Sequence, residues 1–168
     1  EFEDSKASVL GDFVPSKLGF EADEKPLCMI VTTDYSGFMM FFFENGKAAK
    51  VNMQGYDTKT NRKKLIKAYS DKSPLVAAFY EKEDVEYVLN STAGRVLLVN
   101  TGAISIKTTK DTAGVNVMTL KKYHKLQSVR HYVEGEFSKP YRYRTKTLPA
   151  AGATLSADDT AEQLSLLD

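Results

Sequence analysis

The sequence contains few of the residues from which disulfide frameworks and membrane helices are built. Its 168 residues include a single cysteine, Cys28, so an internal disulfide is excluded and the usage fits a reducing cytoplasm. The longest wholly apolar run, residues 38–43, is far shorter than the roughly 20 residues that a transmembrane helix needs. No basic segment followed by an apolar one opens the chain, so we expect no signal peptide. These scarcities favour a cytoplasmic globular protein.

Residues that could carry catalysis are also scarce. The two histidines, His124 and His131, lack a cysteine or paired acids at metal-ligand spacing, and we interpret both as surface residues. Cys28 lies in an apolar stretch without a basic partner, which predicts a buried and inert thiol. Neither a glycine-rich phosphate loop nor a Gly-x-Ser-x-Gly motif occurs. The sequence therefore predicts no active site, no metal and no cofactor, and we expect the chain not to be an enzyme by itself.

The most informative feature present is an internal repeat that aligns Gly37 with Gly94, 57 positions later. The first copy comprises residues 29–33, Gly37, residues 38–43, Asn45-Gly46 and residues 47–51. The second copy comprises residues 88–92, Gly94, residues 96–99, Thr101-Gly102 and residues 103–107. Asn-Gly between two strand-like runs is a strong β-hairpin signal. A unit of this length predicts an all-β, propeller-like array of four-stranded blades, each burying its apolar face against a neighbour.

The repeat also sets the expected organisation of the chain. We expect blades within residues 1–147, with a first full unit at about residues 18–72 and a second at about 75–135. The acidic segment 148–168 is predicted to be a disordered tail. Because the first residue is Glu1 rather than Met, we read the chain as part of a longer protein.

The formal net charge of +1 hides a strong segregation of charge along the chain. Residues 47–72 carry a net +6 and residues 104–147 a net +7, whereas residues 1–26 and 148–168 each carry −4. Clustered positive charge in a near-neutral chain is typical of a surface that binds a polyanion. Solvated loops would give the same pattern, and charge alone leaves both interpretations open.

The repeated unit resembles the C-terminal domain of the A subunit of bacterial type IIA topoisomerases, which are DNA gyrase and topoisomerase IV. The resemblance lies in a strand such as residues 29–33 followed by a glycine, an apolar strand ending in Phe-Phe, an Asn-Gly turn and a lysine-bearing strand. Residues 58–70 look like an inter-blade loop of that family. The resemblance covers roughly residues 7–135.

The resemblance implies a β-pinwheel whose basic rim binds and bends duplex DNA, while strand passage belongs to a separate breakage-reunion domain. It implies as partners duplex DNA, the rest of the A subunit and, through it, the ATPase B subunit of an ATP-dependent enzyme associated with the bacterial nucleoid. The residues that match rim-facing basic positions are Lys47, Lys50, Arg62, Lys63, Lys64, Lys67, Lys107, Lys110, Lys121, Lys122 and Lys125.

Two departures from the family pattern bear on this expectation. The gyrase motif of Gln, two Arg, paired Gly, Lys and Gly has no equivalent, because residues 61–64 are basic but contain no glycine. This favours a topoisomerase IV-like or divergent protein, or a fragment without the motif-bearing blade. Two clear units are also too few to close a disc, so either the array continues upstream or the pinwheel is shortened with an open edge. A protein-interaction or regulatory β-repeat module with weak DNA binding is the alternative function.

Overall fold

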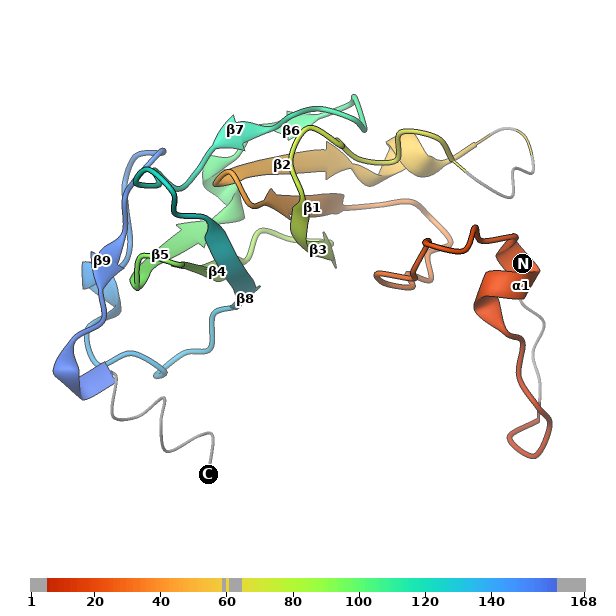
Figure 1. The fold of residues 1–168 in the computed structure, drawn as a ribbon, viewed down its shortest axis with the longest axis horizontal. Coiled ribbons are helices and arrows are strands. Elements are labelled where there is room, and N and C mark those ends of the chain that lie inside the picture. Colours follow the sequence, from red (N-terminus) through yellow and green to blue (C-terminus); the bar gives the residue numbers. More distant parts are fainter. Residues whose placement is uncertain (1–5, 59, 61–64, 160–168) are drawn as a thin grey trace.

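The computed structural model describes residues 6–58, 60 and 65–159, and its regular structure consists mainly of short β-strands (Figure 1). This confirms the predicted all-β class. In chain order the elements are α1 Val14–Leu18, β1 Phe38–Phe43, β2 Lys47–Asn52, the 3-10 helix η1 Met53–Tyr56, β3 Leu75–Glu81, β4 Glu86–Ser91, β5 Arg95–Asn100, η2 Thr101–Ala103, β6 Ile106–Lys107, β7 Val115–Asn116, β8 Leu126–His131, η3 Pro140–Arg142 and β9 Ala153–Thr154.

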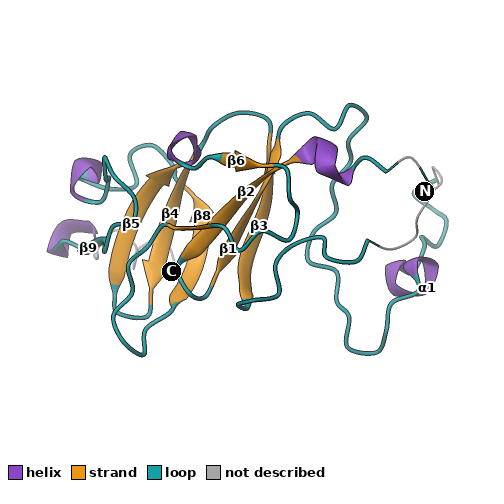
Figure 2. Cartoon of the chain, turned by 90° about the horizontal axis from the view of Figure 1, so that it is seen from above, coloured by secondary structure: helices purple, strands orange, loops and turns teal. Residues whose placement is uncertain are grey.

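The strands form two sheets, which we call blade 1 and blade 2 (Figure 2). Blade 1 has the strand order β3-β1-β2-β6, with β7 also paired to β2, and blade 2 has the order β8-β4-β5-β9. An antiparallel hairpin forms the middle of each blade, β1–β2 in one and β4–β5 in the other. The third strand, β3 or β8, pairs antiparallel with the first strand of its hairpin. The predicted partial array of blades is therefore confirmed; blade 2 has four strands, and blade 1 has five because β6 and β7 both pair with β2.

The internal repeat is real, but its spacing is shorter than the sequence suggested. β1, β2 and η1 begin at positions 38, 47 and 53, and their counterparts β4, β5 and η2 begin 48 positions later, at 86, 95 and 101. A positive-φ glycine ends each hairpin turn, Gly46 with φ 78° and Gly94 with φ 66°. An asparagine, Asn52 or Asn100, then caps the following 3-10 helix with its side-chain oxygen. The two copies thus share turn, strand and cap.

The alignment of Gly37 with Gly94 was wrong because it paired the wrong strands of the two hairpins. Residues 96–99 were matched to β1, but they lie in β5, the counterpart of β2. Thr101-Gly102 was matched to the Asn45-Gly46 turn, but it lies in η2. Both apolar runs are buried on two faces and lack an alternating pattern, so nothing within the runs themselves indicates their register.

The outer edge of each blade is completed by chain from further along the sequence. β6 pairs parallel and β7 antiparallel with β2 of blade 1. In blade 2, Arg144 bridges Leu98 in parallel orientation and β9 pairs antiparallel with β5. We call residues 106–115 and 144–153 the outer segments of blades 1 and 2. The sheets therefore cross the unit boundaries that the sequence suggested.

The outer segment of blade 2 also corrects the expected disorder of the tail. Residues 148–159 belong to the folded part of the chain: β9 pairs with β5, and Leu155 packs against the apolar cluster that contains Tyr143. Asp159 is fully buried. Residues 160–168 lie outside the described residues.

Three apolar clusters divide the core by blade face. Alternate residues of β1 beginning at Phe38 and of β4 beginning at Tyr87 form the cluster between the blades. The other face of blade 2, including Val88, is covered by the C-terminal part of the chain through Phe137. The other face of blade 1, which we call its far face, carries Met39, Phe41, Phe43, Ala49, Val51 and Met53.

The strand expected at residues 29–33 does not form. These residues lie in irregular chain beside the far face, and Met29 and Val31 are 74% and 85% exposed. Cys28 is exposed rather than buried, which corrects the prediction for its thiol. The physical reason is that, among the described residues, no strand lies alongside to supply the ladder hydrogen bonds.

Candidate nucleic-acid interface

Each of the two outer segments contains a glycine that allows it to pack closely against its blade. Gly114 has φ 73° and Gly152 has φ 69°, a region that glycine enters at low cost. A Cβ at Gly114 would lie 2.3 Å from the Ala48 carbonyl oxygen, and one at Gly152 would lie 2.5 Å from that of Val96. Glycine therefore permits both the positive φ and the close approach of the outer segment to the blade backbone. The rest of each outer segment then lies along the outer edge of its blade.

Three of the predicted lysines lie at the outer edge of blade 1. Lys107, in β6, is exposed. Lys47 is half-buried and pairs across the ladder with Asn116 of β7. Lys110 is also half-buried: its Nζ donates to the Gly55 carbonyl oxygen at 2.7 Å. Lys110 therefore fastens the outer segment to η1, whereas Lys107 is open to an anion in solution.

Lys50 is an internal residue, which corrects its expected place on the rim. It is 7% exposed, and its Nζ donates to Asp84 Oδ1 at 2.6 Å and to the Thr101 carbonyl oxygen at 3.2 Å. The hydrogen bond from Lys50, followed by that from the Thr101 hydroxyl, lowers the pKa of the Asp84 carboxyl. Because β2 is buried on both faces, its central lysine joins the two blades and is not available to phosphate.

Three further predicted lysines lie in the loop before β8. Lys121 and Lys122 are exposed, and Lys122 Nζ lies 5.0 Å from the centroid of the exposed Tyr123 ring. Lys125 forms an ion pair with Glu44 of the β1–β2 turn, with 2.7 Å between Nζ and Oε2. An exposed pair of this kind contributes little stability, so exchanging Glu44 for a phosphate would cost little.

The remaining predicted residues belong to the segment after η1. Lys67 is exposed and has φ 58°. Residues 65–69 and 71–72 line a hollow together with residues 111–113, so Lys67 lies beside the outer segment of blade 1. Arg62, Lys63 and Lys64 lie outside the described residues.

Sequence reasoning missed a second set of cations at or next to the outer segment of blade 2. Lys139, Arg142 and Lys146 are exposed, and none has an ion-pair partner within the described part of the chain. Arg144 instead binds Glu86, with Nε to Oε1 at 2.9 Å and one terminal amino group to Oε2 at 2.8 Å. These hydrogen bonds raise the pKa of Arg144. The available signal was four basic residues within positions 139–146.

The described ranges hold no group of three or more His, Cys, Asp or Glu side chains arranged to bind a metal ion. No helix in that part of the chain is long and apolar enough to span a bilayer. What the arrangement offers is a series of exposed ammonium and guanidinium groups along the outer edges of two neighbouring blades. Such a series suits an extended polyanion.

Comparison with known proteins identifies the fold of the chain by structure but not by sequence. No model of a known protein family matches the sequence, and no curated protein matches it significantly. By structure, the chain matches the C-terminal domain of DNA topoisomerase IV with a TM-score of 0.71 and 20% sequence identity, over 90% of this chain and 51% of that one. The chain has the fold of these topoisomerase domains.

Two further solved domains share the fold. The DNA gyrase A C-terminal domain matches with a TM-score of 0.55 and 17% identity, over 82% of this chain and 50% of that one. The E. coli ParC C-terminal domain matches with a TM-score of 0.51 and 10% identity, over 79% and 60%. The resemblance read from the sequence is thus confirmed as a likeness of fold. The chain spans about half the length of the first two domains.

Proposed function

We propose that this chain is a non-catalytic accessory domain of a type IIA topoisomerase A subunit, where it binds and bends duplex DNA. The observation that carries the proposal is the set of exposed cations on equivalent edges of both blades, represented by Lys107 on blade 1 and Lys146 on blade 2. Each edge is built by the same outer-segment architecture, so a phosphate backbone could follow one edge and continue onto the next. The shared fold supports the assignment to a topoisomerase subunit.

Binding of this kind would depend on phosphate charge rather than on base sequence. Each neutralised phosphate releases condensed counterions, so the logarithm of the binding constant falls with the logarithm of salt concentration by about 0.9 per contact. If about five contacts form, the slope would be about −4.5, and affinity would fall by about 10²–10³ between 50 and 200 mM salt. Bending duplex DNA across two blades costs a few kcal/mol, which added contacts offset.

In this proposal the parent protein is an ATP-dependent topoisomerase that acts at the bacterial nucleoid. Strand breakage belongs to the rest of the A subunit and ATP hydrolysis to the B subunit. This chain would contribute a surface that guides a DNA segment toward them.

The test is a titration of a fluorescent duplex with the 168-residue chain, followed by anisotropy from 50 to 300 mM salt. We expect Lys107→Ala and Lys146→Ala each to weaken binding and to reduce the salt slope by about one. Lys82→Ala is the matched control, because Lys82 is exposed but follows β3, at the opposite edge of blade 1 from β6. A fluorescence-transfer assay on a doubly labelled duplex would report the bend.

A wild-type salt slope near zero would refute the DNA-binding proposal. It would favour the alternative, a protein-interaction or regulatory β-repeat module. The exposed apolar residues at the N-terminal end of the structure, Leu27 and Val31 among them, are the observation in favour of that second function.

A further inference from the structure

The turn before β8 carries a tyrosine in a backbone conformation that suits glycine. Residues 121–124 form this turn, and a hydrogen bond from the His124 backbone amide to the Lys121 carbonyl oxygen, at 3.0 Å, closes it. Tyr123 is the third residue of the turn and has φ 67°. Turns with a positive φ at this position usually take glycine or asparagine there, because a Cβ is unfavourable in the left-handed region. A tyrosine therefore makes the turn less stable than a glycine would.

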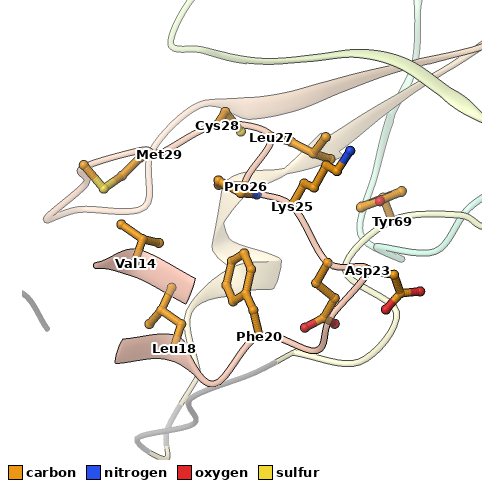
Figure 3. Close-up of a pocket in the computed structure, with 11 residues that line it drawn as sticks. Val14, Leu18, Phe20, Asp23, Lys25, Pro26, Leu27, Cys28, Met29 and Tyr69 are labelled. Carbon is orange, nitrogen blue, oxygen red and sulfur yellow. The ribbon is translucent and has the colours of Figure 1, made fainter. Parts of the chain in front are cut away.

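The Tyr123 ring offsets this cost with no burial, unlike other tyrosines of the chain. It is 88% exposed, and its ring is approached by Lys122 Nζ at 5.0 Å from the centroid. Tyr35 also has a positive φ, 47°, but it packs against the far face of blade 1. Tyr69, which lies beside the hollow in Figure 3, stacks on Phe41 with 5.4 Å between the ring centroids. An unfavourable φ that serves no packing indicates that the side chain serves a ligand.

The hairpin turns of both blades hold the base of this turn in place. The Thr92 backbone amide, in the β4–β5 turn, donates to the Lys125 carbonyl oxygen at 2.9 Å, and the Lys125 amide donates to Thr92 Oγ1 at 3.0 Å. The Leu126 amide donates to the carbonyl oxygen of Glu44, in the β1–β2 turn, at 2.9 Å. An aromatic ring on a support that is already ordered loses little conformational freedom when it binds a ligand.

The side chains around Tyr123 match the two parts of a nucleotide. Lys121 and Lys122 are exposed, and their ammonium groups suit phosphate, whereas an exposed aromatic ring suits the flat face of a base. In an intact duplex each base is already stacked between its neighbours, so contact with the ring would first require unstacking. An unpaired base presents its face without that cost. The turn therefore fits DNA that is locally opened better than DNA that is fully paired.

We infer that Tyr123 stacks on an unpaired base of bound DNA, with Lys121 and Lys122 contacting the adjacent phosphates. This inference rests on the proposed function, DNA binding, and adds to it a preference for locally opened DNA over intact duplex. Stacking uses the face of the ring and not its hydroxyl group. Phenylalanine should therefore replace Tyr123, whereas leucine should not.

The test measures, by anisotropy, the binding of the 168-residue chain to two fluorescent duplexes of equal length. One duplex is fully paired, and the other has a central run of unpaired thymines. We expect the wild type to bind the opened duplex at least about fivefold more tightly, the lower end of what one base–aromatic stack contributes. Tyr123→Leu should abolish this preference and leave the affinity for the paired duplex within about twofold of wild type, whereas Tyr123→Phe should keep the preference. An opened duplex also bends more easily, so a preference that survives in Tyr123→Leu would overturn the inference.

Tyr123→Gly separates binding from folding. Glycine adopts the positive φ at low cost, so we expect a melting temperature equal to or above that of wild type, together with loss of the preference for the opened duplex. A lower melting temperature would show that the ring supports the fold, and it would overturn the inference.

Tyr141→Ala is the matched control for an exposed tyrosine among cations. Tyr141 is 70% exposed and lies between Lys139 and Arg142 in sequence, but it belongs to the 3-10 helix η3 and not to a turn with positive φ. This variant should keep the preference for the opened duplex. If it lost the preference as Tyr123→Leu does, the assignment of stacking to Tyr123 would be wrong.

The two duplexes also separate this inference from the proposed function. Salt-dependent binding of the paired duplex, without a preference for unpaired thymines, would overturn the role of Tyr123 alone. A Tyr123-dependent preference for unpaired thymines, without salt-dependent binding of the paired duplex, would support that role and overturn the duplex-binding function. Absence of binding to either DNA would overturn both.

Discussion

Asp159 links the end of the described chain to blade 2, and neutralising it should unfold that link. Its carboxylate is fully buried and accepts from the Ser138 backbone amide and hydroxyl at 2.7 Å each, from the Ser156 hydroxyl at 2.6 Å and from the Tyr143 hydroxyl. Tyr143 is itself buried in the apolar cluster on that face of blade 2. The carboxylate therefore joins three separate points of the chain.

Asp159→Asn keeps the shape of the side chain but removes its charge and gives one oxygen position to a donor. Hydrogen bonds to charged groups contribute about 1.5–3 kcal/mol each, and a buried donor left without a partner costs about 1–3 kcal/mol. With two of the four bonds lost, we expect the free energy of unfolding to fall by about 3 kcal/mol. In a chain of this length that corresponds to a melting temperature about 6–12 °C lower.

The pH dependence follows from the direction of the Asp159 pKa shift. Burial alone raises the pKa, but the hydrogen bonds from Ser156, Tyr143 and Ser138 outweigh it, so the pKa of the folded state lies below the usual value. A lowered folded pKa stabilises the protein above the unfolded pKa of about 3.9, and this stabilisation is lost as pH falls through the folded value. The difference between wild type and Asp159→Asn should therefore be constant from pH 5 to 8 and shrink below pH 4.

Urea unfolding followed by circular dichroism at several pH values is the assay. Asp158→Asn is the matched control, since its neighbouring carboxylate is exposed and the formal charge change is the same. The reasoning is refuted if the two variants unfold within about 0.5 kcal/mol of each other at pH 7, the usual range for surface substitutions.

Two further substitutions test the seating of the outer segment and the corrected place of Lys50. Gly114→Ala should lower the free energy of unfolding by about 2 kcal/mol or more, because it adds a clash with the Ala48 carbonyl to an unfavourable φ. Gly94→Ala has open space around the new methyl group and should cost about 1 kcal/mol. Similar losses of stability for the two variants in thermal unfolding would contradict this account. Lys50→Met should change stability by less than about 2 kcal/mol, since Asp84 is half exposed and can be solvated, and it should leave the salt slope of duplex binding unchanged. A salt slope reduced by about one would instead indicate that Lys50 contacts a DNA phosphate.

Much of the local structure could be predicted because it depends on neighbouring residues. The turn at Asn45-Gly46 was predicted correctly, since its geometry follows from the residues themselves. The strand expected at residues 29–33 was predicted wrongly. These residues have the composition of a strand, but a strand exists only when another supplies hydrogen bonds, and no described residue does so.

The sequence could predict that basic residues cluster, but it could not predict which of them contact other residues. Segregated lysines indicated a basic surface, and Lys107 and Lys121 are exposed as that requires. The same counting could not separate Lys50, whose partner Asp84 is 34 residues away, from the exposed lysines. Nor did it single out Arg142 and Lys146, which flank Arg144, the residue that bridges Leu98 of β5 at the outer edge of blade 2.

The sequence by itself determined that this protein is a β-repeat with hairpin turns and basic stretches, because these properties belong to short segments. The tertiary structure decided the register of the repeat, the strands that complete each sheet and the cations that remain in solvent. Those outcomes depend on contacts between residues far apart in the chain, such as Lys50 of β2 with Ile106 of β6 and Val96 of β5 with Ala153 of β9. The distinction is physical: a turn is stabilised where it forms, whereas an edge strand is stabilised only by the sheet that it joins.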